Sequence, residues 1–396
     1  MKIDLSDKVY LYIPENEECY SSGKEYVMQV IAPQPEGRIG GSDTHVLELA
    51  FQQKSKSVFA PIVLFKRNYE YELRLRRRLL AYISCIKAND DDEIAEALET
   101  LNEIIPIRII HSHQYDANFL TQTIKTKCDC LTKVPTVMTC HGWIENTEKD
   151  IKETERDFNS YEYADALITV CEKDFYRIRA DRRYVEKRMV CIRNGVSIPS
   201  EEEYMQSDLL TPDTHDKKVI IYVGRLAYEK RVDLIIRMFS YLLRLRKDIV
   251  LFVIGNGDEK ENLVNQVKME GLENYIVFTG LMEMPEKAYK ACDLMVLLSE
   301  TEGTPRSVLE CMSYGKTTVA TNVGGLHEII ESGENGILLD SNDPRMCANI
   351  VNELLDCPKQ LEKMGQSARK TIISRFSIGS MCEKVEELYQ NMLKEM

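Results

Sequence analysis

The chain has 396 residues, 44% of them hydrophobic, and a formal net charge of -13. At roughly 150 residues per domain, this length predicts two domains. The acidic balance argues against a general nucleic-acid binder, because phosphate backbones select basic surfaces, so any phosphate site is expected to be local. No apolar run reaches the length of a membrane span, and the first residues lack the basic start and apolar centre of a signal peptide, so we expect a cytoplasmic protein. The twelve cysteines include no CxxC pair and are expected to be mostly buried, reduced thiols.

Short β-branched runs alternate with longer amphipathic stretches, a rhythm that predicts parallel sheets with crossover helices. The first half has such runs at residues 27–31, 58–64, 108–110, 136–139, 166–170 and 189–192. The second half has them at residues 219–223, 249–254, 276–279, 294–298, 317–320 and 337–339. Because no clear period joins the halves, we predict domains over residues 1–205 and 206–375. The apolar stripe within residues 376–396 predicts a helix that returns towards the first domain, and the strand-like segment 9–13 has no assigned place.

The most informative segment is residues 299–310, SETEGTPRSVLE, which follows an expected buried strand and turns from a loop into a helix. Thr304 is a favourable N-cap and Pro305 suits the first helical position. The amides near Arg306 and Ser307 are therefore expected to present free donors and form an anion site.

Two glutamates of this segment, Glu302 and Glu310, are expected at the carboxyl edge of the sheet, where such folds bind ligands; the alternative is that they are solvated helix acids. A glutamate, seven residues and a second glutamate resemble the signature of the GT-B glycosyltransferases of glycosyltransferase family 4. Residues 223–230, VGRLAYEK, resemble that family's phosphate-binding segment, and residues 279–281, TGL, its base-binding loop. The resemblance covers roughly residues 25–390 and implies that Glu310 binds ribose hydroxyls and Glu302 contacts the donor sugar.

The resemblance also implies that Arg225 and Lys230 hold the donor diphosphate. A guanidinium fork and an ammonium can neutralise a leaving diphosphate without a metal, although exposed loop cations often have no role. Arg306 departs from the family pattern, in which asparagine is frequent, and we favour its projection into solvent over contact with an anionic group. The expected donor-binding residues are Gly40, Gly41, Arg225, Lys230, Leu281, Gly303, Thr304, Arg306, Ser307 and Glu310.

Glycines mark three further segments. Residues 37–48, GRIGGSDTHVLE, resemble the family's glycine-rich loop, in which Gly40 and Gly41 would let the backbone approach the donor phosphate at a helix N-terminus. Residues 323–328, VGGLHE, also match the family, where paired glycines let a backbone approach the ligand region. The GxGxxG fingerprint of dinucleotide-binding proteins is absent, and residues 255–257, GNG, are interpreted as a turn, which disfavours a nicotinamide enzyme.

Histidines end two of the expected strands of the first half. His111 and His113 follow one run and His141 follows another, and a family active-site histidine matches His141. Alternate residues on a strand share a face, so a metal interpretation of His111 and His113 stays open, but acceptor binding by His113 and His141 is preferred and no metal site is expected. Asp116 and Asn118 are expected to cap the following helix.

A basic segment interrupts the acidic chain and is placed in a helical pattern that continues to Ile83. It predicts either peripheral contact with anionic lipid at the inner face of a membrane or a solvated helix face. Its arginines are Arg74, Arg76, Arg77 and Arg78.

Together these features predict an α/β protein of GT-B architecture, with two Rossmann-like doubly wound domains facing a central cleft, the donor held mainly by the second and the acceptor by the first. The expected function is that of a metal-independent, retaining glycosyltransferase that uses no cofactor. It would use a nucleotide diphosphate sugar, UDP favoured, and a glycan, lipid-linked or small-molecule acceptor. The expected catalytic residues are Glu302, His141, Arg225 and Lys230. The alternatives are a nucleotide-sugar 2-epimerase, which needs no acceptor, and a non-catalytic nucleotide-sugar binding module.

Overall fold

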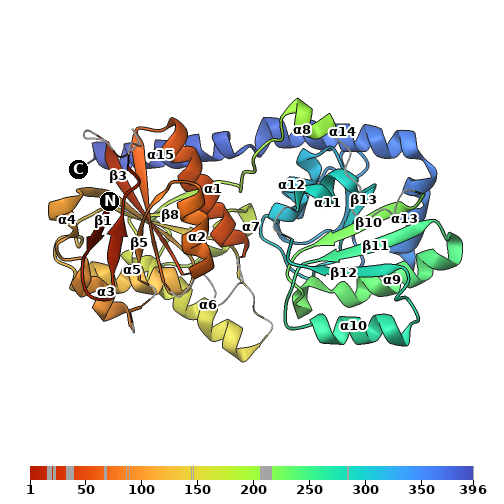
Figure 1. Ribbon diagram of the computed structural model, residues 1–396, viewed down its shortest axis with the longest axis horizontal. Coiled ribbons are helices and arrows are strands. Elements are labelled where there is room, and N and C mark those ends of the chain that lie inside the picture. Colours follow the sequence, from red (N-terminus) through yellow and green to blue (C-terminus); the bar gives the residue numbers. More distant parts are fainter. Residues whose placement is uncertain are drawn as a thin grey trace. The chain divides into compact units, whose positions relative to one another are not determined.

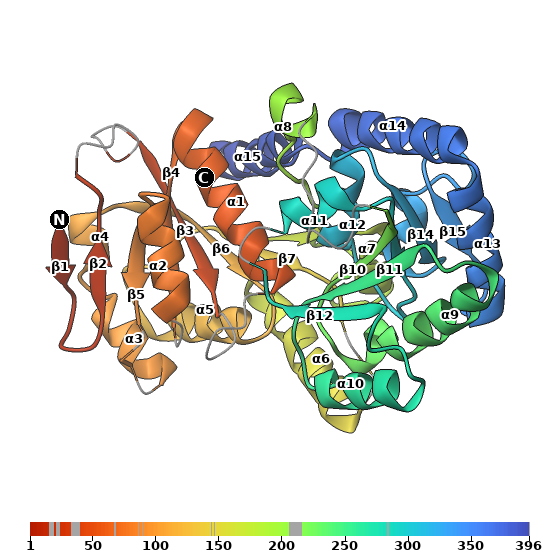
Figure 2. The ribbon, with the colours of Figure 1, turned by 45° about the vertical axis from the view of Figure 1, so that its right-hand side comes forward.

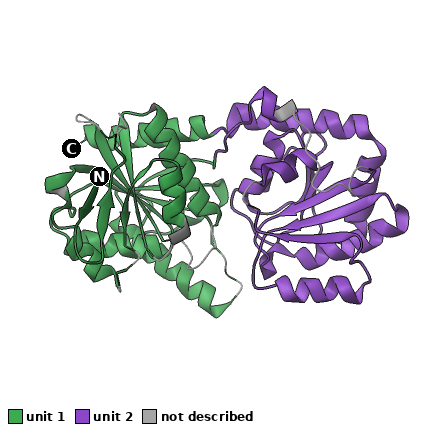
Figure 3. Ribbon diagram, viewed as in Figure 1, with its two compact units in different colours: residues 1–194, 378–396 green, residues 195–377 purple. Residues whose placement is uncertain are grey.

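The chain forms two compact units. The computed structural model describes residues 1–15, 20, 24–32, 40–66, 69–85, 87–88, 90–143, 145, 147–205, 216–282 and 285–395. The first unit comprises Met1–Asn194 and Ile378–Met396, and the second comprises Gly195–Ser377 (Figure 3). The chain thus leaves the first unit after residue 194, eleven residues before the predicted boundary at 205, and its C-terminal helix belongs to the first unit.

The first unit is built on a nine-stranded sheet in the order β1-β2-β5-β4-β3-β6-β7-β8-β9. Its strands are β1 (Lys2–Asp4), β2 (Tyr10–Tyr12), β3 (Glu25–Ile31), β4 (Phe59–Phe65), β5 (Ala81–Ser84), β6 (Ile107–His113), β7 (Thr136–Cys140), β8 (Ala166–Thr169) and β9 (Arg188–Cys191). Its helical segments are α1 (Gly41–Lys56), α2 (Tyr69–Arg77), α3 (Asp91–Ala97), α4 (Leu101–Ile104), α5 (Asp116–Lys127), α6 (Glu148–Ser160), η2 (Tyr161–Tyr163), α7 (Glu172–Arg179) and α15 (Ile378–Lys394).

Strands β3 to β9 pair in parallel, whereas β1 and β2 form an antiparallel hairpin at one edge. The unplaced segment 9–13 therefore contains β2, which pairs with the edge strand β1 on one side and with β5 on the other. The predicted helical continuation to Ile83 is wrong: α2 ends at Arg77, Leu79 takes a left-handed backbone with φ 52°, and the chain enters β5. Most β3–β8 residues are buried, as continuous apolar runs predict for parallel strands covered on both faces.

Helix α15 supplies part of the core of the first unit. Met381, Cys382, Val385, Leu388 and Tyr389 form the predicted stripe and are buried. They join one apolar cluster with residues of β3, β4 and α1, and α15 packs against α1 (Figure 1). The last helix is therefore an integral part of the first unit.

The second unit contains a six-stranded sheet in the order β12-β11-β10-β13-β14-β15 (Figure 1 and Figure 2). All its strands pair in parallel. Its strands are β10 (Lys218–Val223), β11 (Ile249–Ile254), β12 (Ile276–Gly280), β13 (Leu294–Leu297), β14 (Thr317–Thr321) and β15 (Ile337–Leu339). Its helical segments are α8 (Glu201–Met205), η4 (Tyr228–Lys230), α9 (Val232–Leu245), α10 (Lys260–Met269), α11 (Glu286–Ala291), α12 (Arg306–Ser313), η5 (Gly324–Glu328), α13 (Pro344–Asp356) and α14 (Pro358–Arg375).

This strand order is the doubly wound arrangement, in which the order of connection reverses between the first and fourth parallel strands of the unit. In the second unit the reversal lies between β10 and β13, and in the first between β3 and β6. Ligands of such sheets bind beyond the carboxyl ends of the strands at this switch point. Each unit thus has a defined position at which a ligand-binding site is expected.

Two expectations from composition concern thiols and membranes. All the cysteines that the structure describes are free, and most are buried, as expected. None of the helices among the described residues combines the length and apolar character that a bilayer crossing requires.

Candidate functional site

The switch point of the second unit brings together the charged residues that the sequence singled out. Arg225 follows β10, Lys230 ends η4, and Glu302 lies in the loop after β13. Strands β10 and β13 are hydrogen-bonded neighbours, paired through Ile220 and Leu294, so the loops that follow them lie together. The two predicted phosphate-binding cations and the predicted sugar-contacting acid therefore share one edge of one sheet.

Lys230 and Glu302 form an ion pair. The Lys230 ammonium lies 2.8 Å from Glu302 Oε1, and the two side chains are 20% and 7% exposed. The Ser299 hydroxyl donates to the same carboxylate oxygen at 2.7 Å. Burial and two donors fix the direction of this carboxylate, so Glu302 is held in place before any ligand arrives.

Arg225 is the more exposed cation, at 54%, and its guanidinium pairs with buried Glu229. Its backbone carbonyl accepts a hydrogen bond from the Tyr222 hydroxyl at 2.7 Å. The turn at residues 255–257 supports this segment: a Cβ on Gly255 would lie 1.8 Å from the carbonyl oxygen of Gly224, within a contact that only glycine permits. The glycines interpreted as a turn therefore also back the Arg225 loop.

Glu310, on α12, has both carboxylate oxygens engaged. The buried Tyr289 hydroxyl donates to Oε2 at 2.9 Å, and Arg306 Nη2 donates to Oε1 at 3.2 Å. Arg306 Nη1 also donates to the carbonyl oxygen of Gly195 at 3.0 Å, and its side chain is only 9% exposed. The favoured projection of Arg306 into solvent is therefore wrong.

The start of α12 lies one residue later than predicted. Pro305 is the N-cap, with an extended ψ of 114°, and Arg306 is the first helical residue, so Thr304 does not cap this helix. Thr304 is buried, whereas Ser307 in the first turn is partly exposed. The loop is braced from behind, because Gly325 N donates to the carbonyl oxygen of Gly303 at 3.0 Å.

Leu281 follows β12, immediately after Gly280, whose φ is 72°. Its side chain is 58% exposed. It lies at the same carboxyl edge of the sheet as the Arg225 loop, because Gly280 pairs with Ile254 and its carbonyl accepts from Gly255 N at 2.9 Å. This is a position from which backbone atoms could contact a base.

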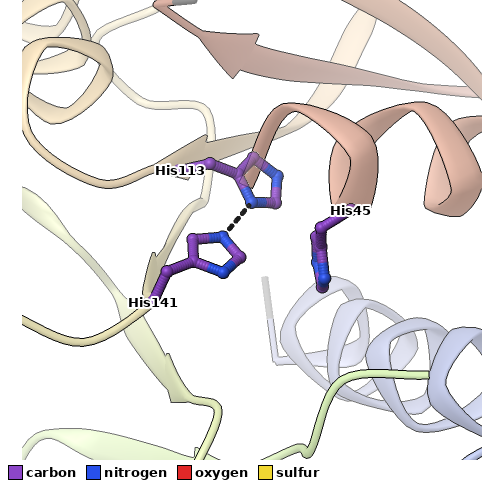
Figure 4. Close-up of side chains that lie close together, drawn as sticks. All are labelled: His45, His113 and His141. Atoms are coloured by element: carbon purple, nitrogen blue, oxygen red, sulfur yellow. Dashed lines mark hydrogen bonds between the residues drawn. The ribbon is translucent and has the colours of Figure 1, made fainter. Parts of the chain in front are cut away.

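In the first unit, three histidines from three elements gather in one cluster (Figure 4). His113 ends β6, His141 follows β7, and His45 lies on α1. His113 Nδ1 is 3.3 Å from His141 Nε2, and the ring centroids of His45 and His141 are 4.7 Å apart. His45 Nδ1 lies 3.0 Å from Asn194 Oδ1, the last residue before the chain leaves the unit.

The neighbours of His113 define its tautomer. The amide nitrogen of Gln29 donates to Gln53 Oε1 and to the Tyr389 hydroxyl, so Gln29 Oε1 is the acceptor that faces His113 Nε2 at 2.8 Å. His113 Nε2 therefore carries the proton, and Nδ1 accepts from His141 Nε2. Burial, followed by the neighbouring histidines, holds the pKa of His113 well below its usual 6.5, so the ring is neutral at pH 7.

Among the hydrogen bonds that the structure describes, His111 is linked to His113 only indirectly, through the Tyr389 hydroxyl and Gln29. Its Nδ1 lies 2.5 Å from the Tyr389 hydroxyl and its Nε2 lies 2.7 Å from Thr139 Oγ1, and burial lowers its pKa to about 3. A metal site built on His111 and His113 therefore has no support in this geometry. The nitrogens of His45, His113 and His141 lie within 4.8 Å of one another, a set that is close enough to hold a metal ion.

The glycine-rich segment falls partly outside the described residues, which resume at Gly40. Gly40 is the N-cap of α1, and its amide donates to Asp43 Oδ2 at 2.6 Å. An added Cβ at Gly41 would meet no atom within 4 Å among the described residues. Burial raises the pKa of Asp43 to about 6, and the Gly40 amide and Arg74 oppose that rise. One donor at this helix end is therefore already used by a carboxylate.

A buried carboxylate, Asp157 of α6, ties the loops that carry the histidines. Its Oδ1 accepts from Tyr115 N and Asn118 Nδ2, both at 2.8 Å, and its Oδ2 accepts from Trp143 Nε1 at 3.0 Å and the Tyr161 hydroxyl at 2.9 Å. Tyr115 and Trp143 follow β6 and β7, two residues after His113 and His141 respectively. Asp157 thus links the segment after β6 to the segment after β7 through its carboxylate.

The expected caps of α5 are wrong. The N-cap is Tyr115, with φ 44°, and no side chain caps the helix. Asn118 is fully buried and bonds Ser112 and Asp157 instead, while Asp116 is the first residue of the helix.

Arg76 and Arg78 of the basic segment are paired within the first unit. Arg76 donates to Glu72 at 2.5 Å and to the Tyr82 hydroxyl at 2.7 Å, and Arg78 pairs with Glu48 at 2.8 Å. These ion pairs neutralise part of the positive charge that would attract an anionic lipid. Contact with a membrane stays a prediction, and sedimentation with anionic vesicles at low salt tests it.

Sequence reasoning missed Tyr289, Asp157 and the role of His45. Tyr289 and Asp157 carry no motif and are found only through contacts across the fold. His45 stood within the glycine-rich segment, four residues after Gly41, and this place on the first turns of a helix beside the switch point was the available signal.

Two doubly wound α/β units, one of which gathers cations and carboxylates at its switch point, define a class of two-unit proteins suited to anionic ligands. Residues 39–198 match the family profile described as Glycosyltransferase Family 4, and residues 211–371 match the profile described as Glycosyl transferases group 1. The chain belongs to this family of GT-B glycosyltransferases, as the sequence predicted.

Curated relatives carry transferase names. The alpha-D-kanosaminyltransferase of Streptomyces kanamyceticus is 28% identical over 179 residues, 45% of this chain and 46% of that protein. A glycosyltransferase of Methanocaldococcus jannaschii, described as uncharacterized, is 26% identical over 305 residues, 73% of this chain and 76% of that protein. The chain thus spans about half the length of the first of these relatives and three quarters of the second.

Solved structures confirm the GT-B fold. The Anabaena protein HepE, in complex with UDP-glucose, superposes with a TM-score of 0.77 at 17% identity, covering 93% of this chain and 99% of that one. Sucrose-phosphate synthase from Thermosynechococcus elongatus gives a TM-score of 0.76 at 15% identity, covering 94% and 100%.

Proposed function

We propose that the chain is a retaining, metal-independent glycosyltransferase that takes a sugar from a UDP-sugar donor and passes it to a glycan, lipid-linked or small-molecule acceptor. The observation that carries the proposal is the set of charges at the switch point of the second unit. There the Lys230–Glu302 pair, Arg225 and Glu310 combine cations for a diphosphate with carboxylates for hydroxyl groups. Neither kind of group alone would suit a nucleotide sugar.

The donor residues have distinct tasks in this proposal. Arg225 and Lys230 neutralise the diphosphate as it leaves, which is why no metal ion is needed. Glu310 accepts hydrogen bonds from the ribose hydroxyls, and Glu302, fixed by Ser299 and Lys230, accepts from hydroxyls of the donor sugar. Fixed carboxylates bind hydroxyls well because little rotational freedom is lost on binding.

The acceptor is assigned to the histidine cluster of the first unit. His113 is neutral and accepts a hydrogen bond from His141, so the His141 ring is oriented by a partner that carries no charge. We propose that His141 hydrogen-bonds the acceptor hydroxyl. The hydroxyl oxygen then bonds to the anomeric carbon on the face from which the diphosphate departs. The bond to the diphosphate oxygen breaks, that oxygen takes the hydroxyl proton, and the configuration at the anomeric carbon is retained.

The choice of UDP is supported by HepE, a structural neighbour solved with UDP-glucose. Transferase activity is supported by the two family profiles, which together cover both units. The same neighbours do not distinguish one acceptor from another, so all three acceptor classes are retained in the proposal.

The test is a binding and hydrolysis panel. UDP-, GDP- and ADP-sugars are added with EDTA to the wild type, Glu310→Ala and Arg225→Ala, and thermal stability and sugar release are followed. Arg244→Ala is the matched control, because Arg244 is an exposed arginine of the same unit and lies on α9. We expect stabilisation by the UDP-sugar in the wild type and the control, unaffected by EDTA and lost in the two site variants.

The outcomes separate the alternatives. Isomerisation of the donor sugar in the absence of any acceptor would identify a 2-epimerase, and binding without turnover across an acceptor panel would identify a binding module. Loss of stabilisation on chelation would contradict metal independence, and inversion of the anomeric centre, read by NMR of the product, would contradict retention.

A further inference from the structure

Arg306 is a buried cation in a place where the family resemblance leads one to expect asparagine. Its guanidinium donates to Glu310 Oε1 at 3.2 Å and to the carbonyl oxygen of Gly195 at 3.0 Å. Its Nε is buried and, within the part of the chain that the structure describes, has no hydrogen-bond partner. A buried guanidinium keeps this position only if its two bonds offset its desolvation, so these two contacts define what Arg306 does.

The first contact sets the direction of Glu310. Tyr289 holds one carboxylate oxygen at 2.9 Å and Arg306 holds the other, so the side chain is fixed from two sides. Asparagine at position 306 is too short to bridge the same two acceptors. Arg306 therefore acts on a ligand through Glu310 rather than through a contact of its own.

The second contact reaches the place where the chain passes between the units. Gly195 is the first residue of the second unit, and Ser377 is the last. Val196 N donates to the carbonyl oxygen of Phe376 at 2.9 Å, and Val196 pairs with Ser377 as a parallel bridge, so both crossings lie together within this unit. Arg306 holds the carbonyl next to that bridge.

The residue before Gly195 is held through its side chain within the first unit. Asn194 Oδ1 lies 3.0 Å from His45 Nδ1, and His45 belongs to the histidine cluster. The two consecutive residues Asn194 and Gly195 thus each receive a hydrogen bond, one from the histidine cluster and one from the residue that orients Glu310. We name this dipeptide, Asn194–Gly195, the junction.

We propose that Arg306 is a positioning residue that fixes Glu310 for the nucleotide and couples occupancy of the donor site to the junction. The inference rests on the proposed function. A ribose hydroxyl that donates to Glu310 competes with Arg306 for the carboxylate lone pairs. Because Gly195 is the other partner of the same rigid guanidinium fork, a change in the Arg306–Glu310 bond also changes the Arg306–Gly195 bond. Coupling of this kind is reciprocal, so the state of the junction also alters nucleotide affinity.

The test measures amide hydrogen exchange at the junction with and without saturating UDP. Peptides that contain Val196 and Ser377 are compared in the wild type, Arg306→Asn and Arg306→Lys, and UDP affinity is measured by calorimetry. In the wild type, UDP is expected to change the exchange rate of the Val196 amide by about five-fold or more, the lower end of ordinary coupling between sites. Arg306→Asn is expected to bind UDP about ten-fold more weakly and to lose that response.

Arg306→Lys separates charge from bridging, because a lysine keeps the cation but lacks the planar fork that reaches two acceptors. We expect it to recover most of the UDP affinity without the response at the junction. If UDP binds all three proteins and changes exchange at Val196 equally in each, the coupling is wrong. If UDP, GDP and ADP all fail to bind the wild type, the proposed function fails and this inference with it.

Discussion

Gly324 offers a sharp test of how the second unit positions Glu302. It is the first residue of η5 and has a left-handed backbone with φ 56°. A Cβ added there would lie 1.6 Å from the carbonyl oxygen of Glu302 and 2.6 Å from its carbonyl carbon. The paired glycines were predicted to let a backbone approach the ligand region, and the first of them, Gly324, contacts the backbone of Glu302 itself.

Gly324→Ala combines two costs. The left-handed backbone costs an alanine about 1 kcal/mol. The Glu302 carbonyl must also retreat from 1.6 Å to the 3.4 Å of an ordinary contact, which moves the loop by more than an ångström. Since a misplacement of about 1 Å can cost about 10²-fold in rate, we expect kcat/KM for release of the sugar from UDP-sugar to fall by at least about that factor.

A matched control isolates the second cost. Gly271 in the same unit has φ 66°, and its added Cβ would meet nothing within 4 Å. Gly271→Ala should therefore lose about 1 kcal/mol of stability, like any strained alanine, and keep its activity. If both variants turn over donor within two-fold of each other, Gly324 does not position Glu302 and the reasoning is refuted.

Three further predictions concern single contacts. Tyr289→Phe removes a hydroxyl that donates to Glu310, and a hydrogen bond to a charged group is worth about 1.5 kcal/mol, so UDP should bind about ten-fold more weakly by calorimetry; an unchanged Kd contradicts this. His111 has a pKa of about 3 in the fold, below the 6.5 of an unperturbed ring, so the unfolded chain binds more protons and stability is lost as pH falls. Between pH 7 and 5 this loss is about 2 kcal/mol, measured by urea unfolding, and His111→Gln should flatten it; an equal slope in the variant excludes His111 as the source. Asp157→Ala leaves four donors, three of them in buried bonds, without their acceptor and should cost about 3 kcal/mol or more by the same assay, and a loss below about 1 kcal/mol would show that the loops are held by other contacts.

The sequence predicted most strands because buried parallel strands are continuous apolar runs. It missed β5 and placed its Ile83 in a helix, because the short apolar run at residues 79–83, close after an amphipathic helix, continues the helical pattern as well as it begins a strand. The left-handed backbone of Leu79 lies between the two elements, and no residue type there predicts this conformation. Boundaries of this kind are set by tertiary packing.

That the candidate donor residues gather at one edge of the sheet could be predicted, because they lie close in sequence to their strands and form a motif. Their partners could not. Tyr289 reaches Glu310 and Arg306 reaches Gly195 across 21 and 111 positions of the chain, and nothing local in the sequence reports such contacts. The contacts of Asp157 could not be predicted either, because in the sequence it is one of several acidic residues on an amphipathic helix.

The pairing of charges in the proposed donor site bears on how an acidic chain would bind an anion. Each cation at the switch point already has a carboxylate partner: Arg225 with Glu229, Lys230 with Glu302 and Arg306 with Glu310.

A diphosphate that enters therefore exchanges partners instead of meeting bare cations, and its affinity is the difference between two sets of ion pairs. Such a difference favours a ligand that also satisfies the carboxylates, which inorganic pyrophosphate cannot do and a nucleotide sugar can through its hydroxyls. If the proposed function holds, we expect the site to discriminate against free phosphates without any repulsive group aimed at them.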